Sequence, residues 1–588
     1  MNGIMNFVWL DINASWSHSS LALPALHANL SPAVAAACNM QVVRGTIKSP
    51  PSQIVQELAA MEPTYIFATG WLFNINYLNE VLCRISALCS PLGIFLGGPE
   101  FLGDNSDFLR SNPHVTAVFK GEGEEMFEPF INSLLAQDDA WKNITGFEWI
   151  ENGAYHNSSN VIVQNFKDLH YPEESELFSW DKSFVQIETS RGCFNSCRFC
   201  VSGIEKAPVV DIPIENLRQR FQAAVDKGIK QIRLLDRTFN GKPARAMQLL
   251  ELFKEFTGEL NFHLEVHPAL LFPAGESAAE STNPSAVGKL REALTQVPDG
   301  LLHIEAGIQT LRQDVLDMCC RKGTCAQAVE GLEHLAASSA FEVHADLIAG
   351  LPGYSYSQLV EDTLELMKIA PGEIQLESLK LLPGTWFRNK AESLGIKYSP
   401  VTPYEVLQTP SITYNELGKA MTLSKILDLW YNDSKWQSVF RDIFSTGNIS
   451  CITSAPLLEQ LIEELHGTDY ITQPLSLENK GILLYRFCKQ HIPELAPLVS
   501  LEWVRNGLSI KKEPAENFCK WELSQGTDSN PIFVEGDPRY KYYHITIEHK
   551  EYSTLDSSQQ KRSTRHWFSF NKEIERIAPC GYYAEDIN

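Results

Sequence analysis

The chain lacks several features that would place it in a common functional class. Its 588 residues include 49 Lys and Arg against 72 Asp and Glu, which is a formal net charge of −23. This balance argues against bulk electrostatic binding of DNA, RNA or an anionic membrane, although it leaves room for a local patch that recognises one structured RNA. No apolar run is long enough to span a bilayer, and residues 1–10 carry no basic leader or cleavage-site pattern. We therefore expect a cytoplasmic protein.

Disulfides are also not expected. The 13 cysteines are an odd number and most are scattered, which fits a reducing compartment rather than a disulfide framework. Apolar residues make up 44% of the chain and charged residues 21%, as in ordinary globular proteins. A chain of this length exceeds a single hydrophobic core, so we predict three or four domains.

Three cysteines stand close together, with the spacing C-x3-C-x2-C: Cys193, Cys197 and Cys200. Thiolates are soft ligands, and three of them hold three irons of a cubane cluster while leaving the fourth iron open to a small molecule. A zinc knuckle would need a fourth Cys or His nearby, and none lies within the next twenty residues. Chance would produce this spacing less than about once in a hundred such chains. The motif therefore predicts an iron–sulfur cluster on a loop after a strand at 184–189.

A repeated strand–helix rhythm runs through residues 184–382. The strand candidates are 184–189, 231–236, 261–267, 301–308, 342–348 and 374–381. Helical patterns separate them, as in βα units with parallel strands. Six units without sign of eight predict an open, partial barrel.

Polar residues alternate with apolar ones on four successive strands of this predicted barrel. The polar sets are His263, Glu265 and His267, then His303, Glu305 and Gln309, then Glu342, His344 and Asp346, and finally Gln375 and Glu377. Parallel strands that are buried on both faces are usually apolar throughout. A carboxylate facing a helix layer would cost several kcal/mol unless it were paired. We therefore expect the polar row to face the lumen and to make it a polar site.

Residues 1–150 show a similar rhythm with short apolar runs. The runs are 7–11, 41–44, 65–68, 94–96 and 115–119, and each is followed by turn residues and an amphipathic stretch. The pattern predicts a doubly wound, Rossmann-like α/β domain with a parallel sheet, in which ligands bind at the carboxyl ends of the strands. No G-x-G-x-x-G opens a helix here, which counts against a dinucleotide site.

The C-x3-C-x-aromatic-C motif after a strand resembles that of the radical S-adenosylmethionine (radical SAM) superfamily. The resemblance implies that the three cysteines bind a [4Fe–4S] cluster whose open iron takes the amino and carboxylate groups of S-adenosylmethionine. It also implies cofactor contacts from Phe199 and Gly350 to Gly353 near the adenine, from Asp236 at the methionine amino group, and from Glu265 and Gln309 at the ribose or methionine end. The G-G-E motif of other branches is missing at the Asp236 position.

Upstream of this motif, the loops after the N-terminal strands resemble the cobalamin-binding domain of the cobalamin-dependent branch of that superfamily. The match is close in the Gly97-Gly98-Pro99-Glu100 loop and in the loop that begins at Gly121. The resemblance implies a cobalamin site formed by Ser17, His18, Ser19, Trp71, Asn74, Gly97, Gly98, Pro99, Glu100, Gly121, Glu122 and Gly123. The D-x-H-x-x-G signature is absent, which implies a cobalamin without a histidine ligand, as in many members of that branch.

These patterns predict four segments. Residues 1–150 form the cobalamin-binding domain, 151–182 a polar linker, 183–400 the partial (β/α)6 barrel, and 401–588 a mainly helical domain. Within the last segment we expect helices at 415–445, 455–466, 477–490 and 495–508 and strands at 531–550 and 564–570. This end resembles an extension of unknown function found on a subset of cobalamin-type radical enzymes.

The leading functional hypothesis is a methyltransferase that uses a [4Fe–4S] cluster, S-adenosylmethionine and cobalamin to modify an unactivated carbon of a small molecule or peptide. One alternative keeps both cofactors but catalyses a cyclisation or rearrangement. Another is a radical SAM enzyme that has lost cobalamin binding, and a third is a non-enzymatic iron–sulfur or cobalamin sensor. An external electron donor such as a flavodoxin or ferredoxin is implied, because no reductase domain is evident.

Overall fold

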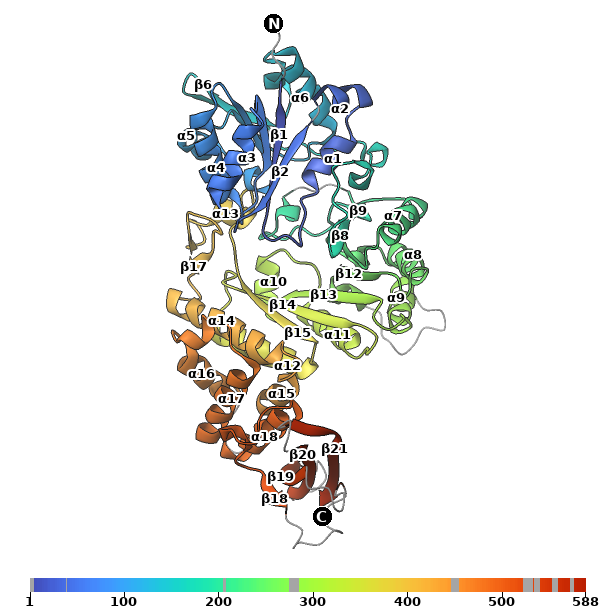
Figure 1. Cartoon of the computed structure of the whole chain (residues 1–588), viewed down its shortest axis with the longest axis vertical. Helices are drawn as coiled ribbons and strands as arrows, with labels where there is room; N and C mark the ends of the chain where they lie inside the picture. The colour runs from blue at the N-terminus through green and yellow to red at the C-terminus, as the bar shows by residue number, and fades with distance from the viewer. Residues whose placement is uncertain are drawn as a thin grey trace. The chain divides into compact units, whose positions relative to one another are not determined.

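The computed structural model describes residues 5–38, 40–204, 208–273, 285–445, 454–521, 532, 540–552, 559–571 and 576–587. The chain divides into two compact units (Figure 1). The first comprises Met1–Ser355 and Ser378–Tyr414, and the second comprises Tyr356–Glu377 and Asn415–Asn588.

The first unit begins with a seven-stranded sheet of order β2-β1-β3-β4-β5-β6-β7. Its strands are β1 (Phe7–Asn13), β2 (Gln41–Thr46), β3 (Tyr65–Thr69), β4 (Gly93–Gly97), β5 (Ala117–Phe119), β6 (Phe147–Glu151) and β7 (Ala154–His156). The first five pair in parallel, and β6 and β7 add on as antiparallel strands. The parallel part confirms the expected doubly wound architecture, whereas the two antiparallel strands were not anticipated.

Helices cover both faces of this sheet (Figure 1). The helices α3 (Pro51–Ala60), α4 (Ile75–Leu88) and α5 (Ser106–Ser111) lie on one side, and α1 (Ala22–Ala28), α2 (Pro32–Cys38) and α6 (Glu124–Ala136) lie on the other. Alternate residues of β1 therefore enter two different cores: Val8 and Leu10 pack in one, and Phe7 and Trp9 in the other. Burial of each such side chain contributes about 1.5–3 kcal/mol, which explains the continuous apolar runs.

The second sheet of the first unit carries the predicted barrel strands. Within this unit its order is β14-β13-β12-β11-β8, and all neighbours are parallel. The strands are β8 (Phe184–Ile187), β11 (Gln231–Leu234), β12 (Asn261–Val266), β13 (Leu302–Gln309) and β14 (Glu342–Ala349). The accompanying helices are α7 (Ile214–Asp226), α8 (Pro243–Lys254), α9 (Ala286–Thr295), α10 (Gln313–Met318) and α11 (Cys325–Ala336).

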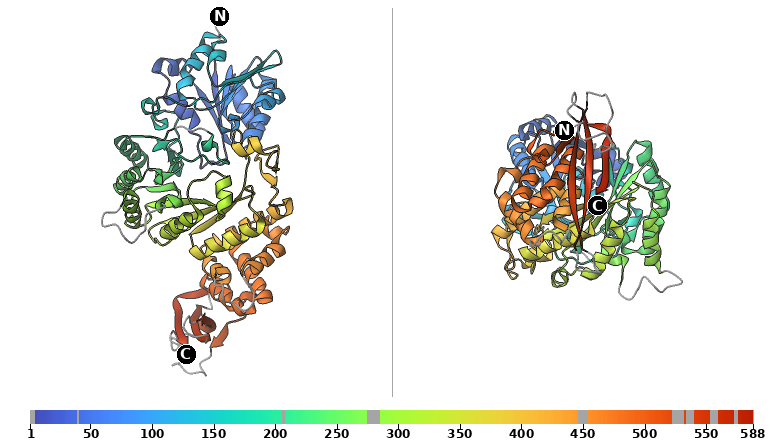
Figure 2. Two further views of the ribbon diagram at one scale, coloured as in Figure 1. Left: turned by 180° about the vertical axis from the view of Figure 1, so that it is seen from behind. Right: turned by 90° about the horizontal axis from the view of Figure 1, so that it is seen from below.

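Helices cover the outer face of this sheet (green in Figure 2). The Phe262 ring of β12 lies 4.0 Å from that of Phe253 in α8 and 5.2 Å from that of Phe221 in α7. The residues between the buried positions of β12, His263 and Glu265, therefore point to the opposite face, because successive side chains of a strand alternate. The structure thus confirms the alternating pattern on which the polar lumen was predicted.

Short elements complete the first unit. They are the two-residue strands β9 (Ser190–Arg191) and β10 (Val210–Asp211), the helix α13 (Trp386–Lys390), and the strands β16 (Lys397–Tyr398) and β17 (Val406–Gln408).

The second unit is mainly helical, as predicted, and ends in a sheet (orange and red in Figure 2). Its helices are α12 (Tyr356–Ile369), α14 (Tyr414–Ile426), α15 (Gln437–Ser445), α16 (Ser454–Leu465), α17 (Leu477–His491) and α18 (Ala496–Arg505), and β15 (Glu373–Ser378) follows α12. An antiparallel sheet follows, of order β18-β19-β20-β21: β18 (Cys519–Trp521), β19 (Tyr540–Tyr552), β20 (Gln559–Asn571) and β21 (Arg576–Ile587). The part of the predicted strand 531–550 before Tyr540 lies outside the described residues, apart from Ile532. Trp430, Trp436 and Trp503 are fully buried, so these three side chains belong to the core of this unit.

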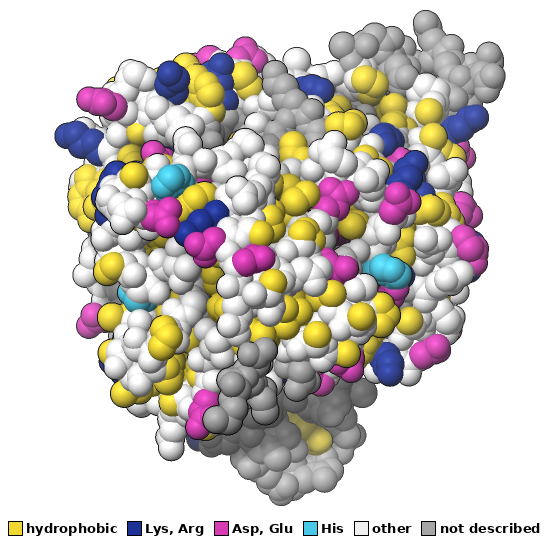
Figure 3. All heavy atoms as spheres, turned by 90° about the horizontal axis from the view of Figure 1, so that it is seen from above, with side chains coloured by type: hydrophobic (Ala, Val, Ile, Leu, Met, Phe, Trp, Pro, Cys, Tyr) yellow, Lys and Arg dark blue, Asp and Glu magenta, His cyan; other side chains and the backbone are white. Residues whose placement is uncertain are grey.

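The charge distribution on one face and the length of the helices can be read directly from the structure. On the face drawn in Figure 3, Lys and Arg side chains are scattered among Asp and Glu rather than gathered in one patch, as far as the described residues show. None of the helices in the described part of the chain is long and apolar enough to cross a membrane.

Candidate active site

The three motif cysteines lie on a tight loop that follows β8 and β9. The Cys200 N–H donates to the Cys197 carbonyl at 3.1 Å, and the Gly203 N–H donates to the Cys200 carbonyl at 3.0 Å. A Cβ atom on Gly203 would lie only 2.4 Å from the Cys197 carbonyl oxygen, so this turn requires glycine. The loop geometry therefore follows from local backbone bonds and one close approach.

The Cys197 thiol is buried and lies next to a cation. Burial raises its pKa, Arg321 lowers it, and the nearby Cys200 and Cys193 thiols raise it. Arg321 Nη1 lies 3.8 Å from Cys197 Sγ, and Arg321 Nη2 donates to the Gly307 carbonyl at 2.5 Å. The fold thus brings the three thiols together and supplies one guanidinium that favours thiolate at the most buried of them.

Asp236 holds the start of this loop. Its carboxylate accepts from the Thr189 N–H at 2.8 Å, from Thr189 Oγ1 at 2.7 Å and from Ser190 Oγ at 2.5 Å. Burial of this side chain raises its pKa, and the three hydrogen bonds lower it. The carboxylate predicted to contact the methionine amino group therefore also binds the backbone and side chains that lead to the cysteines.

The other residues assigned to S-adenosylmethionine lie along the barrel. Glu265 lies within β12, where burial raises its pKa to about 7 and Arg237 Nη1 approaches its carboxylate at 4.0 Å. Gln309 ends β13 at a register shift and has a φ of 72°. Gly350 and Gly353 follow β14 with φ values of 86° and 89°. Phe199 is half-buried on the cysteine loop.

A cavity of about 1120 Å³ lies in the first unit, between the carboxyl ends of the N-terminal strands and the cysteine loop. Its apolar lining includes Trp9, Phe67, Trp71 and Phe127, and Cys193 also lines it. Drug-sized ligands usually occupy cavities of about 300–1,000 Å³, so this one is large enough for a bulky cofactor. None of the six residues assigned to S-adenosylmethionine is among the described residues that line it.

The structure brings most of the predicted cobalamin residues to this cavity. The lining includes His18, Ser19, Trp71, Gly97, Gly98, Gly121, Glu122 and Gly123. His18 is the one histidine among the described lining residues, and its Nδ1 lies 2.9 Å from Ser15 Oγ and 3.2 Å from Ser17 Oγ. A Cβ atom on Gly97 would meet nothing closer than the Phe119 carbonyl oxygen at 3.9 Å, whereas one on Gly98 would meet the Gly70 carbonyl oxygen at 2.7 Å. Gly97 therefore leaves space at the cavity, and Gly98 is required by packing between loops.

The remaining predicted cobalamin residues, Ser17, Asn74, Pro99 and Glu100, do not line the cavity. Asn74 is buried, and its amide donates to the carbonyls of Ile12 and Thr69 at 2.9 and 3.0 Å. Glu100 is buried, burial raises its pKa, and its carboxylate accepts from the Tyr404 hydroxyl. Asn74 and Glu100 therefore stabilise the loops. Their positions in the sequence had predicted contacts with cobalamin, as for the residues that do line the cavity.

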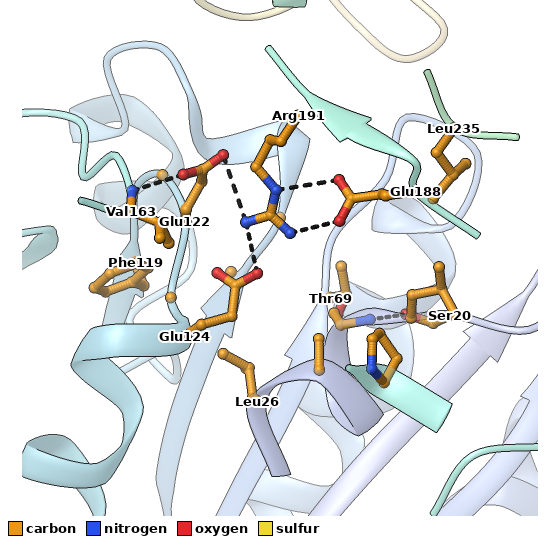
Figure 4. A pocket seen from close by; sticks show the side chains of 18 of the residues that line it. Ser20, Leu26, Thr69, Phe119, Glu122, Glu124, Val163, Glu188, Arg191 and Leu235 are labelled. Atoms are coloured by element: carbon orange, nitrogen blue, oxygen red, sulfur yellow. Dashed lines mark hydrogen bonds and ion pairs between the residues drawn. The ribbon is translucent and has the colours of Figure 1, made fainter. Parts of the chain in front are cut away.

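Arg191, at the start of the cysteine loop, pairs with Glu122 and with Glu124, the first residue of α6 (Figure 4). Its Nη1 lies 2.8 Å from Glu124 and 3.8 Å from Glu122, and its Nη2 lies 2.7 Å from Glu188. Burial opposes the charge, but Glu124 and Glu188 hold the pKa of Arg191 above its ordinary value. The guanidinium also stacks on Phe166, 4.5 Å from the ring centroid. These contacts fix one wall of the cavity.

Sequence reasoning missed several wall residues. The segment predicted to be a linker supplies Ile162, Val163, Gln164 and Phe166 to the lining. It lies there because Val161 forms a bridge with Gly121, and the Val163 N–H donates to Glu122 at 2.6 Å. The three consecutive apolar residues Val161–Val163, within an otherwise polar stretch, were the feature of the sequence that could have predicted a buried position for this segment.

The comparisons with known proteins show which domains the chain contains. Residues 187–366 match the family model described as the radical SAM superfamily, and residues 392–500 match a protein family of unknown function, DUF4080. The chain therefore contains a radical SAM domain followed by an extension of unknown function, as the cysteine motif and the C-terminal pattern predicted.

Within this class, two of the similar proteins are described as methyltransferases, and one of the two as cobalamin-dependent. A cobalamin-dependent radical SAM methyltransferase of Streptomyces tokunonensis is 21% identical over 371 residues, covering 60% of this chain and 52% of the relative. An uncharacterized methyltransferase of Pyrococcus horikoshii is 24% identical over 289 residues, covering 47% and 57%. The chain thus spans a little over half the length of these relatives.

Two solved structures share the fold. The cobalamin-dependent S-adenosylmethionine radical enzyme OxsB has a TM-score of 0.59 at 14% identity and covers 87% of this chain and 83% of its own. The radical S-adenosylmethionine methyltransferase TsrM of Kitasatospora setae has a TM-score of 0.50 at 14% identity and covers 67% and 76%. This chain therefore shares its fold with these two proteins.

Proposed function

We propose that the protein is a cobalamin-dependent radical SAM methyltransferase that modifies an unactivated carbon of a small molecule or peptide. The observation that carries the proposal is the cavity of about 1120 Å³ that places the loops of an N-terminal parallel sheet opposite the cysteine loop of a radical SAM domain. Such an enzyme needs two cofactor sites that face the same space, and this cavity is lined both by the N-terminal loops and by Cys193 of the cysteine loop.

The cysteine loop fits a cluster by its donor chemistry. Cys193, Cys197 and Cys200 would hold three irons, and no fourth protein thiol is needed for a cluster that binds S-adenosylmethionine at its open iron. Arg321, at 3.8 Å from Cys197 Sγ, would stabilise the added electron of the reduced cluster. The role of Asp236, through Thr189 and Ser190, is to hold the loop at the end of β8.

The cavity fits cobalamin by its size and lining. Large aromatic side chains such as Trp9 and Trp71 supply an apolar wall, and Gly97 leaves space at the carboxyl edge of β4. His18 also lines the cavity, where the Ser15 and Ser17 hydroxyls hold its Nδ1, so its ring would lie beside a cobalamin bound there. Together the bound groups would supply a primary carbon radical, made by reductive cleavage of S-adenosylmethionine, and a transferable methyl group.

The lumen would bind the remainder of S-adenosylmethionine and the substrate. Glu265 and Gln309 offer polar contacts from β12 and β13, and the positive-φ loop from Gly350 to Gly353 offers backbone groups after β14. The protein's task there is to orient the reacting groups and exclude water. Electrons would come from a flavodoxin or ferredoxin.

The test is anaerobic reconstitution of the full chain with iron, sulfide and hydroxocobalamin, followed by a count of both per chain. We expect about four irons and one cobalamin. With a reductant, S-adenosylmethionine should be converted to 5′-deoxyadenosine. Four irons without cobalamin would contradict the proposal and leave a radical SAM enzyme that has lost this cofactor, and absence of S-adenosylmethionine cleavage would favour a sensor.

A pair of variants at one position tests the cavity assignment. Gly97→Leu should fill the space at the edge of β4 and lower the affinity for cobalamin at least tenfold, whereas Gly97→Ala should bind nearly as well. Both should keep the iron content of the unmodified chain, because Gly97 ends β4 and is not part of the cysteine loop. Equal binding by the two variants would place cobalamin elsewhere. Once a substrate is found, a product gain of one methylene distinguishes methylation from cyclisation or rearrangement.

A further inference from the structure

A second cluster of ligand-bearing side chains lies in the barrel, away from the cysteine loop. Three imidazoles follow one another across three neighbouring strands: His263 on β12, His303 on β13 and His344 on β14. The His263 and His303 ring centroids are 4.8 Å apart and stacked, and the His303 and His344 centroids are 4.2 Å apart with the rings nearly perpendicular.

The strand register explains why these rings meet. His263 pairs directly with His303, His303 pairs with Glu342, and Glu305 pairs with His344. Residues at matching positions on parallel strands point to the same face, so the three rings and the two carboxylates share the lumen face of the sheet. His263 Nε2 lies 3.1 Å from Glu305 Oε2, which holds the first ring in place.

The donor atoms already lie close enough to share an ion. One ligand atom from each of His303, Glu342 and His344 lies within 4.8 Å of the others. When zinc is bound at about 2.0–2.2 Å, its ligand atoms are roughly 3.3 Å from one another, so movements of these atoms by about 1 Å would complete the site. Two histidines and one glutamate are a known ligand set for zinc that leaves a fourth position open.

Charge and access also favour a cation here. Glu305 and Glu342 outweigh the neighbouring Arg233, whose guanidinium lies over the Phe184 ring at 3.9 Å. With neutral imidazoles the cluster therefore carries an excess of one negative charge. His344 is buried, whereas the Glu342 side chain is 77% exposed, so an ion could enter from this side.

The cluster is separate from the iron–sulfur loop. His303 is the second residue of β13, and Gln309 is its last. At about 3.3 Å per residue, the six-residue step from His303 to Gln309 spans roughly 20 Å along the strand. The histidines therefore lie near the amino ends of the strands, whereas the cysteine loop follows the carboxyl end of β8.

We propose that His303, Glu342 and His344 bind a divalent transition-metal ion, with Zn²⁺ as the best match to the ligand set. Glu305 orients the adjacent His263 ring, and the fourth coordination position takes water. The site ties β13 to β14 at the amino end of the barrel and does not depend on the proposed methyl transfer.

The experiment uses the full chain with its iron–sulfur cluster already reconstituted, because unligated cysteines would also bind zinc. After equilibrium dialysis against Zn²⁺, metal analysis should show one zinc per chain in addition to the cluster irons. X-ray absorption at the zinc edge should show nitrogen and oxygen ligands at about 2.0–2.2 Å and no sulfur at about 2.3 Å. Iron beyond the cluster that zinc displaces would also support the site.

Variants locate the ion. His303→Ala, His344→Ala and the exposed Glu342→Gln should each weaken zinc binding at least tenfold while keeping the cluster iron, which serves as the check on folding. The control is His334→Ala, since this half-buried histidine of α11 lies near the Arg291 carbonyl and belongs to no ligand group. Absence of stoichiometric zinc, a sulfur shell, or zinc binding unchanged in Glu342→Gln would overturn the proposal. Loss of cobalamin binding alone would not affect it.

Discussion

The two parallel sheets of the first unit are built from similar strands but bury them differently. Every residue of β1 from Phe7 to Ile12 is buried, and its two faces enter two separate apolar cores. In β12, buried and half-buried residues alternate along the whole strand. The difference follows from what covers each face: helices lie on both sides of the first sheet, whereas the second has helices on one side and a polar lumen on the other.

This comparison separates two ways in which a parallel sheet carries function. In the first sheet, the strands contribute mainly apolar side chains such as Trp9 and Phe67 to the cavity, and the candidate polar contacts come from the strand ends and the loops that follow, as at Glu122. In the second, polar side chains such as His263 and Glu265 stand within the strand itself. When polar and apolar residues alternate in a strand that has parallel neighbours on both sides, the pattern therefore indicates a polar site on one face rather than burial of both faces.

The largest expected effect tests whether the two sheets serve separate cofactors. Cys197→Ala should reduce the cluster iron to background and lower S-adenosylmethionine cleavage at least about 100-fold, because two ligands cannot hold the cluster. Cobalamin binding should be retained, since the N-terminal loops are unchanged. The exposed Cys83→Ala on α4 is the control. Simultaneous loss of cobalamin from Cys197→Ala would show that the two sites are not independent.

Substitutions on the two sheets should change the free energy of unfolding by different amounts, because their side chains are buried differently. Ile66 of β3 is fully buried between helices, so Ile66→Ala should lower the free energy of unfolding by about 2–5 kcal/mol. Glu305→Gln on the lumen face should lower it by only about 1 kcal/mol, the value of one hydrogen bond. Urea unfolding followed by tryptophan fluorescence measures both. Similar losses would mean that the lumen face is as tightly packed as the N-terminal core.

Removal of the cation beside the cluster should change its reduction potential. Arg321→Met removes the donor at 3.8 Å from Cys197 Sγ, which should lower the midpoint potential by about 50–100 mV, since hydrogen bonds to cluster sulfurs stabilise the reduced form. Arg198→Met is the matched control, because that guanidinium bonds the Met318 carbonyl at 2.9 Å and stacks on Trp386. A redox titration followed by electron paramagnetic resonance gives both values. An equal shift in the two variants would contradict the assignment.

The smallest effect concerns pH. Burial raises the pKa of Glu265 to about 7, so the folded chain retains a proton that the unfolded chain releases near the ordinary carboxyl pKa of 4.5. The contribution of this group to stability is therefore full below about pH 4.5 and is lost as the pH rises to about 7. Because the side chain is 39% exposed, we expect only about 1 kcal/mol. Glu265→Gln should remove this dependence between pH 5 and 8, as measured by urea unfolding, and an unchanged slope would exclude Glu265 as its source.

Local pattern was sufficient to predict most of the architecture. The apolar runs of the first five strands, the alternation on β12 to β14 and the cysteine spacing each depend on neighbours within a few residues. By contrast, β6 and β7 were missed because Phe147–Glu151 is short and mixed in polarity, and its place depends on pairing with β5.

The site was predictable in its loops but not in the direction of its side chains. Asn74 follows β3 and Gly97 ends β4, yet only Gly97 lines the cavity, because Asn74 turns inward to the carbonyls of Ile12 and Thr69. Arg191 pairs with Glu124, 67 positions earlier in the chain. Such long-range partners leave no local signal, and they also explain how a polar segment after β7 became a wall.

The ion pairs of Arg191 also bear on the order in which parts of the first unit fold as the chain is synthesised. All seven strands of the N-terminal sheet, together with Glu122 and Glu124, are synthesised before Arg191. Because N-terminal domains generally fold first during synthesis, these carboxylates would already be in place when the guanidinium leaves the ribosome. The cysteine loop would then begin to fold from an anchored end, next to a finished cavity wall, before the rest of the barrel exists.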